Sequence, residues 1–389
     1  MRPTPHAPRL LCALSLLLLS APGPAPAAPP PSWPKLAEKT ADGFLVPQPN
    51  PQFQFPKDHG SHPDFKVEWW YLTGHLFGPA RERFGFQATF FRRAGMPPSH
   101  GTPQSSRFRT DEIHLFHAAL LDAQTGKFLH HERLARAGWE ASSSTEGLHV
   151  RLGDSSLTMP DPAKEQFRLE STLRGEAGFS LLLEPLKSLV IFGKEGVSRK
   201  GNSETAASWY LTYPRLQTKG EIRIGNRKIA VTGQAWMDHE ISSSQLTGDQ
   251  AGWDWAGIQL EDGREIMTYR LRKKDGSADP ASSLTWVDTQ GKLTHFGSEE
   301  FRWEGCGAWK SPGSGASYPL PVELVCPDPT SGKTVRLTLQ PIAFDQELRG
   351  KSGLAYWEGA CRVWIEDKPA GSAYVELTGY SGDLSQGLR

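Results

Sequence analysis

Apolar and polar residues alternate along most of this chain with a period of two. Residues 148–152 show the pattern, and residues 222–231 repeat it on both sides of a Gly-Asn turn. The strongest hairpin signal joins residues 258–261 to residues 264–271 through the turn Asp262-Gly263. Side chains alternate across a β-strand, whereas a helix repeats its apolar face about every 3.6 residues. Short strands with frequent turns therefore predict an all-β chain of antiparallel barrels or sandwiches, not a parallel α/β sheet.

The length of the chain sets the number of such units. Its 389 residues suffice for two domains, since a domain typically holds roughly 100–200 residues. We expect the boundary near residue 235, which gives an N-terminal domain of residues 51–235 and a C-terminal domain of residues 236–389. Formal charge is balanced, with 43 basic and 43 acidic residues and no basic cluster. We therefore expect no nucleic-acid partner.

The N-terminus has the composition of an export signal. A basic start is followed by the apolar run Leu10–Leu19, and Ala25-Pro26-Ala27 offers small residues for cleavage. The run is too short to span a bilayer, which needs about 20 apolar residues. We expect a signal peptide over residues 1–27, a periplasmic or secreted protein, and no transmembrane segment in the mature chain. Residues 28–50 are rich in Pro and Ala and predict a disordered lead-in.

Removal of that signal would leave three cysteines, all in the C-terminal third. Cys306 and Cys326 flank a loop rich in Gly, Pro and Ser, Trp309–Pro321, and an oxidising compartment favours a disulfide between them. Cys361 would then be a buried thiol. No spacing of Cys and His matches a structural zinc site, so we expect no metal.

Three segments combine aromatic side chains with ionisable ones, and 13 Trp residues make Trp the outlier of the composition. In the first segment, residues 62–75, Glu68 and Trp70 would share one face of a strand and Trp69 the other. A carboxyl among aromatic rings should have a raised pKa unless it finds a cation or hydrogen-bond donors. The alternative is a structural Glu68, bonded to backbone N–H groups or to an Arg.

The second segment, residues 233–244, places Trp236 before three consecutive titratable residues. On a strand, Asp238 and Glu240 would face one way and His239 the other. Two carboxylates on one face can share a proton, and a carboxylate can also orient a neighbouring imidazole. The alternative is a junction between domains held by salt bridges. A divalent metal at Asp238 and Glu240 would lack further ligands.

The third segment starts at residue 252 and runs into the hairpin around Asp262-Gly263. A two-residue turn would place Trp255 opposite Arg270 as a cation–π pair. Asp254 and Tyr269 would then lie diagonally on the other face, as an acid and a phenol directed into a cavity. The alternative is an Asp254 that caps or pairs structurally.

His114 and His117 have the spacing of a metal pair, but a strand would put them on opposite faces. His117 begins an apolar run, and we expect it to be a core or site histidine with a hydrogen-bond partner. The sequence holds no nucleophile elbow, phosphate-binding glycine loop or dinucleotide fingerprint, so we expect no cofactor.

The order and spacing of these segments resemble the AttH/CrtC family. The resemblance runs from about residue 45 to the C-terminus and rests on Glu68-Trp69-Trp70-Tyr71 with Thr73-Gly74-His75-Leu76, His117-Ala118-Ala119-Leu120 with Asp122, Gly233 to Glu240, and Gly252-Trp253-Asp254-Trp255 with Tyr269-Arg270. It implies two lipocalin-like antiparallel β-barrel lobes packed side by side, with the Trp-rich segments near their interface. The implied partner is a lipophilic small molecule, isoprenoid-like or acyl-like, held in an aromatic cavity.

The resemblance also implies an activity. Some relatives are carotenoid hydratases, which add water across an isoprenoid double bond without a cofactor, and many secreted ones are predicted hydrolases. Acid-assisted addition of water needs an acid, aromatic faces to stabilise a cation, and a water molecule. This chain departs from the hydratase branch at Tyr269, where that branch carries an acid two residues later. The other implied role is a non-catalytic accessory protein of an envelope ABC export system.

The candidate site combines these segments. The expected catalytic residues, which would converge across one pocket, are Asp238, His239, Asp254 and Tyr269. The expected ligand-binding residues are Glu68, Trp69, Trp70, His117, Trp236 and Trp253.

Overall fold

The computed structural model describes residues 32–98, 112–351 and 353–382. The expected signal peptide, residues 1–27, lies outside the described residues. The regular structure of the described part is β-strand apart from two short 3-10 helices, η1 (Lys57–His59) and η2 (Pro162–Lys164). Paired strands run antiparallel throughout, which confirms the all-β prediction. Among these described residues, no helix has the length and apolarity needed to cross a membrane.

The first sheet has thirteen strands and forms the N-terminal lobe. Its order is β4-β3-β2-β1-β13-β12-β9-β8-β7-β6-β5, with β10 and β11 paired to β12. The strands are β1 (Val67–Phe77), β2 (Arg83–Arg93), β3 (Ile113–Asp122), β4 (Lys127–Arg136), β5 (Ala141–Ser143), β6 (His149–Leu152), β7 (Ser155–Asp161), β8 (Gln166–Leu173), β9 (Ala177–Pro185), β10 (Val190–Phe192), β11 (Ser198–Arg199), β12 (Ala207–Ile224) and β13 (Arg227–Ser244).

The second sheet has ten strands and forms the C-terminal lobe. Its order is β17-β16-β15-β14-β25-β24-β22-β21-β18, with β23 paired to β24, and a separate two-stranded sheet joins β19 to β20. The strands are β14 (Gln250–Leu260), β15 (Glu265–Lys273), β16 (Ser283–Val287), β17 (Leu293–Gly297), β18 (Arg302–Gly305), β19 (Trp309–Lys310), β20 (Ser317–Tyr318), β21 (Val322–Pro327), β22 (Thr334–Pro341), β23 (Glu347–Arg349), β24 (Ala355–Ile365) and β25 (Lys368–Leu377).

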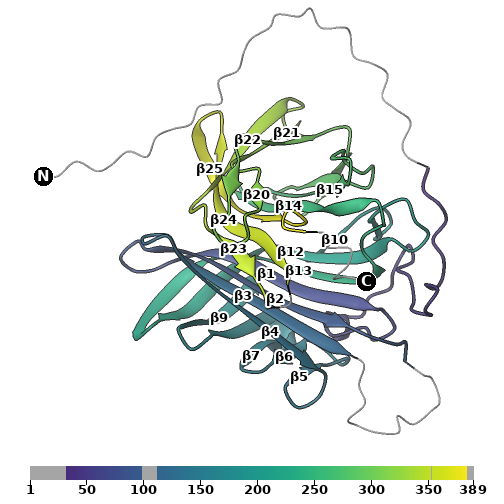
Figure 1. Cartoon of the computed structure of the whole chain (residues 1–389), viewed down its shortest axis with the longest axis horizontal. Coiled ribbons are helices and arrows are strands. Elements are labelled where there is room, and N and C mark those ends of the chain that lie inside the picture. The colour runs from purple at the N-terminus through teal and green to yellow at the C-terminus, as the bar shows by residue number, and fades with distance from the viewer. Residues whose placement is uncertain (1–31, 99–111, 352, 383–389) are drawn as a thin grey trace, which may run out of the picture. The chain divides into compact units, whose positions relative to one another are not determined.

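Each sheet is a lipocalin-like lobe that encloses its own apolar core. Phe86 and Leu181 belong to the core of the first lobe, and Ile258 and Val375 to that of the second. Figure 1 shows the two sheets one above the other, with β24 and β25 of the upper sheet next to β1 and β2 of the lower one. The chain passes between the sheets after Ser244, at the end of β13, whereas the sequence placed the domain boundary near residue 235.

A third apolar cluster joins the two lobes. It contains Tyr71 of β1 and Trp236 of β13 together with Trp255 of β14 and Tyr374 of β25. These side chains alternate with residues that face the lobe cores, because neighbouring residues of a strand point to opposite faces. We call this contact region between the lobes the junction. It is the place where the Trp-rich segments were expected to meet.

The hairpin of β14 and β15 has a different register from the one that the sequence suggested. Leu260 donates its N–H to the carbonyl of Arg264, so the loop has three residues and not two, with Gly263 at a φ of +85°. Trp255 therefore pairs with Tyr269, and Asp254 with Arg270. The shift by one residue exchanges the faces: Asp254 and Tyr269 do not share one, and the expected pair of Trp255 with Arg270 is wrong.

The lead-in before residue 50 is more ordered than its composition suggested. From residue 33 onward it packs on the N-terminal lobe, where Leu36 and Val46 are buried in a cluster with Val197 and Ala207. Backbone hydrogen bonds also tie it down, as between the Ala37 N–H and the Glu204 carbonyl, at 2.9 Å. The few apolar residues among the prolines supply enough buried surface to hold the segment in place.

The disulfide expected between Cys306 and Cys326 does not form. The Cys306 N–H donates to the carbonyl of Pro321, so Cys306 lies opposite Pro321 at one end of the pairing between β18 and β21. Arg302 pairs with Val325 near the other end, and Cys326 lies five residues further along β21 than Pro321. At about 3.3 Å per residue the two cysteines lie roughly 16 Å apart along the ladder, whereas a disulfide needs Cα atoms within about 7 Å. Cys326 and Cys361 are buried free thiols.

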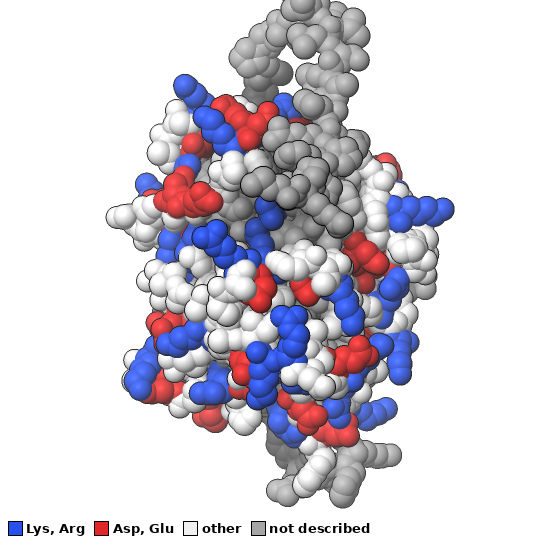
Figure 2. Space-filling view, turned by 90° about the vertical axis from the view of Figure 1, so that its left-hand side faces the viewer, with Lys and Arg blue, Asp and Glu red and all other residues white. Residues whose placement is uncertain are grey.

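Basic and acidic side chains are intermixed on the molecular face shown in Figure 2, where no large area carries a single sign. This mixture agrees with the equal numbers of basic and acidic residues in the sequence, 43 of each.

Candidate active site at the lobe junction

Asp238 is the best-anchored acid of the junction. Its carboxylate accepts three hydrogen bonds, from Tyr210 Oη at 2.8 Å, Thr212 Oγ1 at 2.5 Å and Trp236 Nε1 at 2.7 Å. Burial raises the pKa of Asp238 to about 7, against these three hydrogen bonds, which lower it. Asp238 therefore lies where the sequence expected a site acid, with both oxygens occupied.

Aromatic rings from both lobes surround this acid. Trp255 of the C-terminal lobe donates its indole N–H to Tyr210 Oη at 2.9 Å, and Tyr210 in turn donates to Asp238. The Trp255 ring meets the ring of Tyr71 edge-on, with centroids 5.1 Å apart, and that of Trp236 at 6.1 Å. The result is a wall of indoles and phenols around buried carboxyls, which suits an apolar or cationic group.

Tyr269 also reaches the junction, but its hydroxyl is already occupied. It is hydrogen-bonded to Ser198 Oγ at 2.9 Å and donates to the carbonyl of Arg199 at 3.2 Å. Lys200 Nζ lies over the rings of Tyr269 and Tyr210, at 4.6 and 4.8 Å, and forms a salt bridge of 2.9 Å with Glu240. Tyr269 thus helps to position a buried ion pair beside the site.

His239 does not join these residues, because it points to the opposite face of β13. Its Nε2–H donates to Glu68 at 2.8 Å and its ring stacks on Trp70, with centroids 4.8 Å apart. Glu68 also accepts from His62 Nδ1 and Arg92 Nε. Burial alone would raise the pKa of Glu68, but the hydrogen bonds from His239 and His62 and the charge of Arg92 hold it below its ordinary value.

This inner cluster is also the place in the described residues where a metal could be held. One ligand atom each of His62, Glu68 and His239 lies within 4.8 Å of the others. The guanidinium of Arg92, 3.1 Å from Glu68, already neutralises the carboxylate, and the hydrogen bonds account for the arrangement without an ion. The structural alternative considered for Glu68 therefore describes its surroundings best.

Asp254 lies away from the junction. It faces the inside of the C-terminal lobe, where it accepts from Arg272 Nε at 3.0 Å and Tyr380 Oη at 2.9 Å, with Arg270 at 3.5 Å. The four expected catalytic residues are thus divided: Asp238 and Tyr269 reach the junction, whereas His239 and Asp254 face the separate lobe interiors. The prediction that they converge on one pocket is wrong.

The expected ligand-binding residues are divided in the same way. Trp69 and Trp253 remain partly accessible at the junction, whereas Trp70 is fully buried and donates its indole N–H to the carbonyl of His59. His117 faces the C-terminal lobe and is hydrogen-bonded to Tyr356 Oη at 2.7 Å, as expected for a histidine with a partner. Trp69, His117, Trp236 and Trp253 therefore surround the junction from both sides.

Two junction acids were missed by the sequence reasoning. Glu358 and Glu376 lie directly opposite each other on β24 and β25 and face the N-terminal lobe. Each belongs to a Tyr-x-Glu motif, Tyr356-Trp357-Glu358 and Tyr374-Val375-Glu376. The repeated motif was the available signal, because it puts a phenol and a carboxyl on the same face of each strand.

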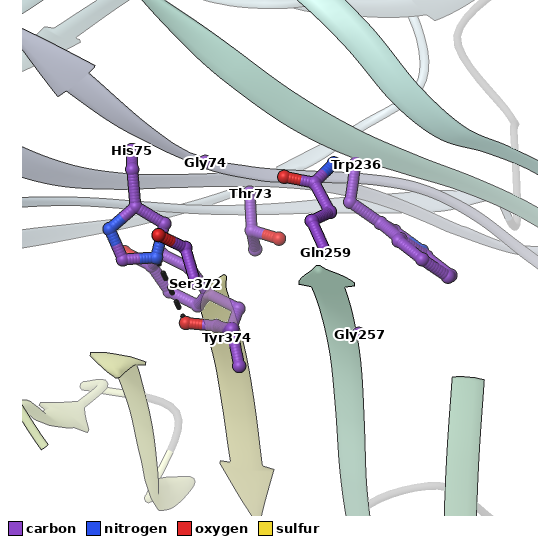
Figure 3. Close-up of a pocket in the computed structure, with 9 residues that line it drawn as sticks. Thr73, Gly74, His75, Trp236, Gly257, Gln259, Ser372 and Tyr374 are labelled. Atoms are coloured by element: carbon purple, nitrogen blue, oxygen red, sulfur yellow. Dashed lines mark hydrogen bonds between the residues drawn. The ribbon is translucent and has the colours of Figure 1, made fainter. Parts of the chain in front are cut away.

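A groove of about 410 Å³ opens at one end of the junction, lined by residues of both lobes that include Arg215, Gln234 and Gln259. Next to it lies a pocket of about 10 Å³, room for a single water. Figure 3 shows the His75 ring beside β25, where its Nε2–H donates to the carbonyl of Ala373 at 2.9 Å, and the indole of Trp236 on the other side of the pocket.

The imidazole of His75 is neutral in this setting. Its Nδ1 accepts from Arg83 Nη2 at 3.0 Å, so the proton lies on Nε2. Burial and the charge of Arg83 lower the pKa of His75 to about 3. His75 therefore serves as a fixed hydrogen-bond link between the lobes at the edge of the pocket.

A family model described as AttH-like matches residues 46–380. A crystal structure of a protein from Nitrosomonas europaea assigned as an AttH is similar to this chain, with 34% identity and a TM-score of 0.76 over 87% of this chain and 99% of that one. A search of curated protein sequences found no significant match.

Two more distant structures share the fold. Kievitone hydratase from Nectria haematococca has 15% identity and a TM-score of 0.64, over 90% of this chain and 99% of its own. CghA in complex with Sch210972 has 12% identity and a TM-score of 0.50, over 89% of this chain and 97% of its own. At identities this low, the comparison shows a shared two-lobed fold and nothing more.

Proposed function

This chain belongs to the AttH-like family, and we propose that it is an exported protein that binds a lipophilic ligand at its lobe junction and catalyses an acid-assisted addition of water to it. The observation that carries the proposal is the set of buried carboxyls among the aromatic rings of the junction, where the pKa values of Asp238 and Glu376 are both raised to about 7. Acids with such pKa values and aromatic walls serve proton transfer to apolar groups near neutral pH.

The chemistry follows from these side chains. Addition of water to an alkene begins with protonation of a carbon and passes through a carbocation. Indole and phenol faces stabilise a cation that lies over them, and a dry surrounding strengthens the effect. The similarity in fold to a protein named kievitone hydratase supports this class of reaction, and hydrolysis of an acyl ligand would use the same acids.

Access to the site is provided by the partly accessible indoles. Trp69 of β1 and Trp253 of β14 come from opposite lobes, and both keep exposed surface at the junction. An isoprenoid or acyl chain on Trp253 would lie close to Glu376, which accepts the indole N–H of Trp253 at 2.8 Å. The export part of the proposal rests on the N-terminal sequence, where a basic start, the run Leu10–Leu19 and Ala25-Pro26-Ala27 follow one another.

A second candidate role is a non-catalytic accessory protein of an envelope ABC exporter. The observation that favours it is exposed apolar surface at the free edge of the first sheet, where Leu134 on β4 is 58% exposed and Trp139 just beyond it is 94% exposed. Such surface is typical of protein contacts. In that role, Trp139→Ala would abolish binding to a membrane partner and leave ligand retention at the junction unchanged.

Native mass spectrometry after mild purification tests the first role. We expect the protein to retain an apolar small molecule, and Trp236→Phe to reduce the retained fraction. Trp286→Phe is the matched control, because Trp286 is buried in the core of the C-terminal lobe and away from the junction. Equal retention in the two variants, or no retained molecule in any of the proteins, would refute binding at the junction.

A further inference from the structure

Glu358 and Glu376 form a carboxyl pair across two neighbouring strands. They are directly opposite in the register of β24 and β25, while Trp357 and Val375 beside them face the core of the C-terminal lobe. Directly opposite side chains on one face of an antiparallel pair have Cβ atoms about 4.5–5.5 Å apart. Two carboxylates at such a distance repel each other, and burial strengthens the repulsion.

The two carboxyls have no basic partner among the described residues. Neither oxygen of Glu358 makes a hydrogen bond within normal geometry, although its side chain is almost completely buried. Glu376 Oε2 accepts from Trp253 Nε1 at 2.8 Å, and Glu376 stays partly accessible. A buried carboxyl without a basic partner is more stable protonated than ionised.

The acids around the pair favour the same state, whereas the hydroxyls of Tyr71 and Tyr356 lower the pKa of Glu358 and oppose it. Tyr71 of β1 and Tyr356 of β24 surround Glu358, and Tyr356 is held by His117, which also contacts Glu132. The titratable groups of β13 that act on Glu376 are Asp238 and Glu240, both acids. Lys200, a base of the junction, is paired with Glu240 at 2.9 Å. Burial and the charge of Glu376 raise the pKa of Glu358 well above its ordinary value.

We propose that Glu358 and Glu376 share one proton and form the proton-donating and proton-accepting pair of the junction, acting on an uncharged alkene. The inference rests on the proposed function and says which acids would transfer the proton and which would position other side chains. Asp238 has both oxygens occupied by three donors and holds Tyr210 and Trp236 in position, whereas Glu358 has free oxygens. Glu358 is therefore the carboxyl that carries the proton, and Asp238 is a positioning residue.

The reaction is balanced and needs no co-reactant except water. The protonated Glu358 gives its proton to one alkene carbon, whose π electrons form the C–H bond, and the other carbon becomes a cation. A water oxygen bonds to that carbon, and one water proton passes to the ionised Glu376. One alkene and one water give one alcohol, and the proton then returns from Glu376 to Glu358 across the pair.

The charge of the pair also selects the ligand. One proton on two carboxyls leaves one negative charge, close to the further acid Asp238. A carboxylate or phosphate head group would be repelled there, whereas a neutral hydrocarbon and its transient cation would not. The ligand class at these residues is therefore a neutral hydrocarbon chain with a double bond, and carboxylate or phosphate head groups are excluded from direct contact with the pair.

Infrared spectroscopy of protein with ¹³C-labelled Glu tests the shared proton directly. At neutral pH we expect the C=O stretch of a protonated Glu carboxyl, absent from Glu358→Gln. In Glu376→Gln the midpoint of Glu358 deprotonation should fall by about one pH unit or more, because interacting groups titrate together. Glu304→Gln, which changes an exposed carboxyl, should leave the signal unchanged. The shared proton would be refuted by the absence of a protonated Glu carboxyl at neutral pH. It would also be refuted if Glu376→Gln left the pH midpoint of Glu358 deprotonation unchanged.

Incubation with squalene in H₂¹⁸O tests its role in catalysis. The wild type should form an alcohol that contains ¹⁸O, and Glu358→Gln and Glu376→Gln should each lower the rate at least tenfold, while Glu304→Gln does not. Formation of the alcohol at the full rate in both pair variants would overturn the catalytic assignment. Absence of product in the wild type, with the infrared signal intact, would instead refute the hydratase function and leave the shared proton standing.

Discussion

Trp255 of the C-terminal lobe donates its indole N–H to the phenolic oxygen of Tyr210 in the N-terminal lobe, at 2.9 Å. Tyr210 in turn donates its hydroxyl hydrogen to the Asp238 carboxylate, at 2.8 Å. This chain of hydrogen bonds connects the two lobes through the centre of the junction, and it shows that the aromatic residues there are fixed by polar contacts as well as by packing. A fixed wall is what a site needs if it is to hold a reactive cation in place.

Replacing Trp255 by Phe should destabilise the protein by about 1–3 kcal/mol, because it removes a buried hydrogen bond and part of a buried ring. Urea unfolding followed by circular dichroism measures the change. Trp139→Phe serves as the control, since Trp139 is 94% exposed and surface substitutions usually stay within about 0.5 kcal/mol. Equal stability of the two variants would contradict the lobe-connecting role of Trp255.

The pH dependence of stability should carry a contribution from Asp238. Its pKa rises from 3.8 in the unfolded chain to about 7 in the folded protein, so the folded state binds more protons in that window. This contribution is complete below about pH 4 and is lost as the pH rises to about 7, with a slope of at most about 1.4 kcal/mol per pH unit.

Asp238→Asn isolates that contribution. His59 and His75 act in the opposite direction, because burial lowers the pKa of each to about 3, and their contribution is lost as the pH falls. The difference between wild type and Asp238→Asn cancels these histidines. We expect the relative stability of Asp238→Asn to improve from pH 4 to pH 7 in urea titrations; a constant difference would mean that Asp238 keeps an ordinary pKa.

Glu68→Gln should be strongly destabilising and should unfold at lower urea concentration by an amount equivalent to about 3–5 kcal/mol. The substitution removes the fully buried one of the two carboxylates that pair with the guanidinium of Arg92, Glu112 being the other, and breaking one side of a buried ion pair is costly. Glu304→Gln, which breaks the exposed pair with Arg302, should change stability by less than about 1 kcal/mol. A mild effect at Glu68 would argue for a site role over a structural one.

Asp254→Asn should lower stability without changing ligand retention. Its carboxylate pairs with Arg272 inside the C-terminal lobe and does not reach the junction. Native mass spectrometry of this variant beside Trp236→Phe separates the two effects. Loss of ligand in Asp254→Asn at a temperature where the variant stays folded would place Asp254 in the site after all.

The sequence predicted the fold class and the meeting of the Trp-rich segments, because alternation and tight turns leave few other architectures. It failed on the face of Asp254, since turns of two and three residues around Asp262-Gly263 look alike in sequence while one residue of register reverses every side chain. It correctly placed Asp238 and His239 on opposite faces of their strand. That separation is the reason why both cannot serve one pocket.

The Tyr-x-Glu motifs were a sequence signal for the junction acids Glu358 and Glu376, but the sequence could not show that the two acids are partners. Each lies in an ordinary alternating strand, and only the pairing of β24 with β25 puts them opposite each other. Their isolation from bases depends on the packing of the other lobe, which local sequence does not encode.

Photoaffinity labelling with a neutral isoprenoid that carries a diazirine tests the central claim most directly, because it reports where the ligand binds. Mapping of labelled peptides should find adducts on the segments with Trp69, Trp253 and Glu376, and excess squalene should prevent them. Labelling confined to the exposed surface around Trp139 and Leu134, or labelling that squalene does not reduce, would contradict a ligand site at the lobe junction.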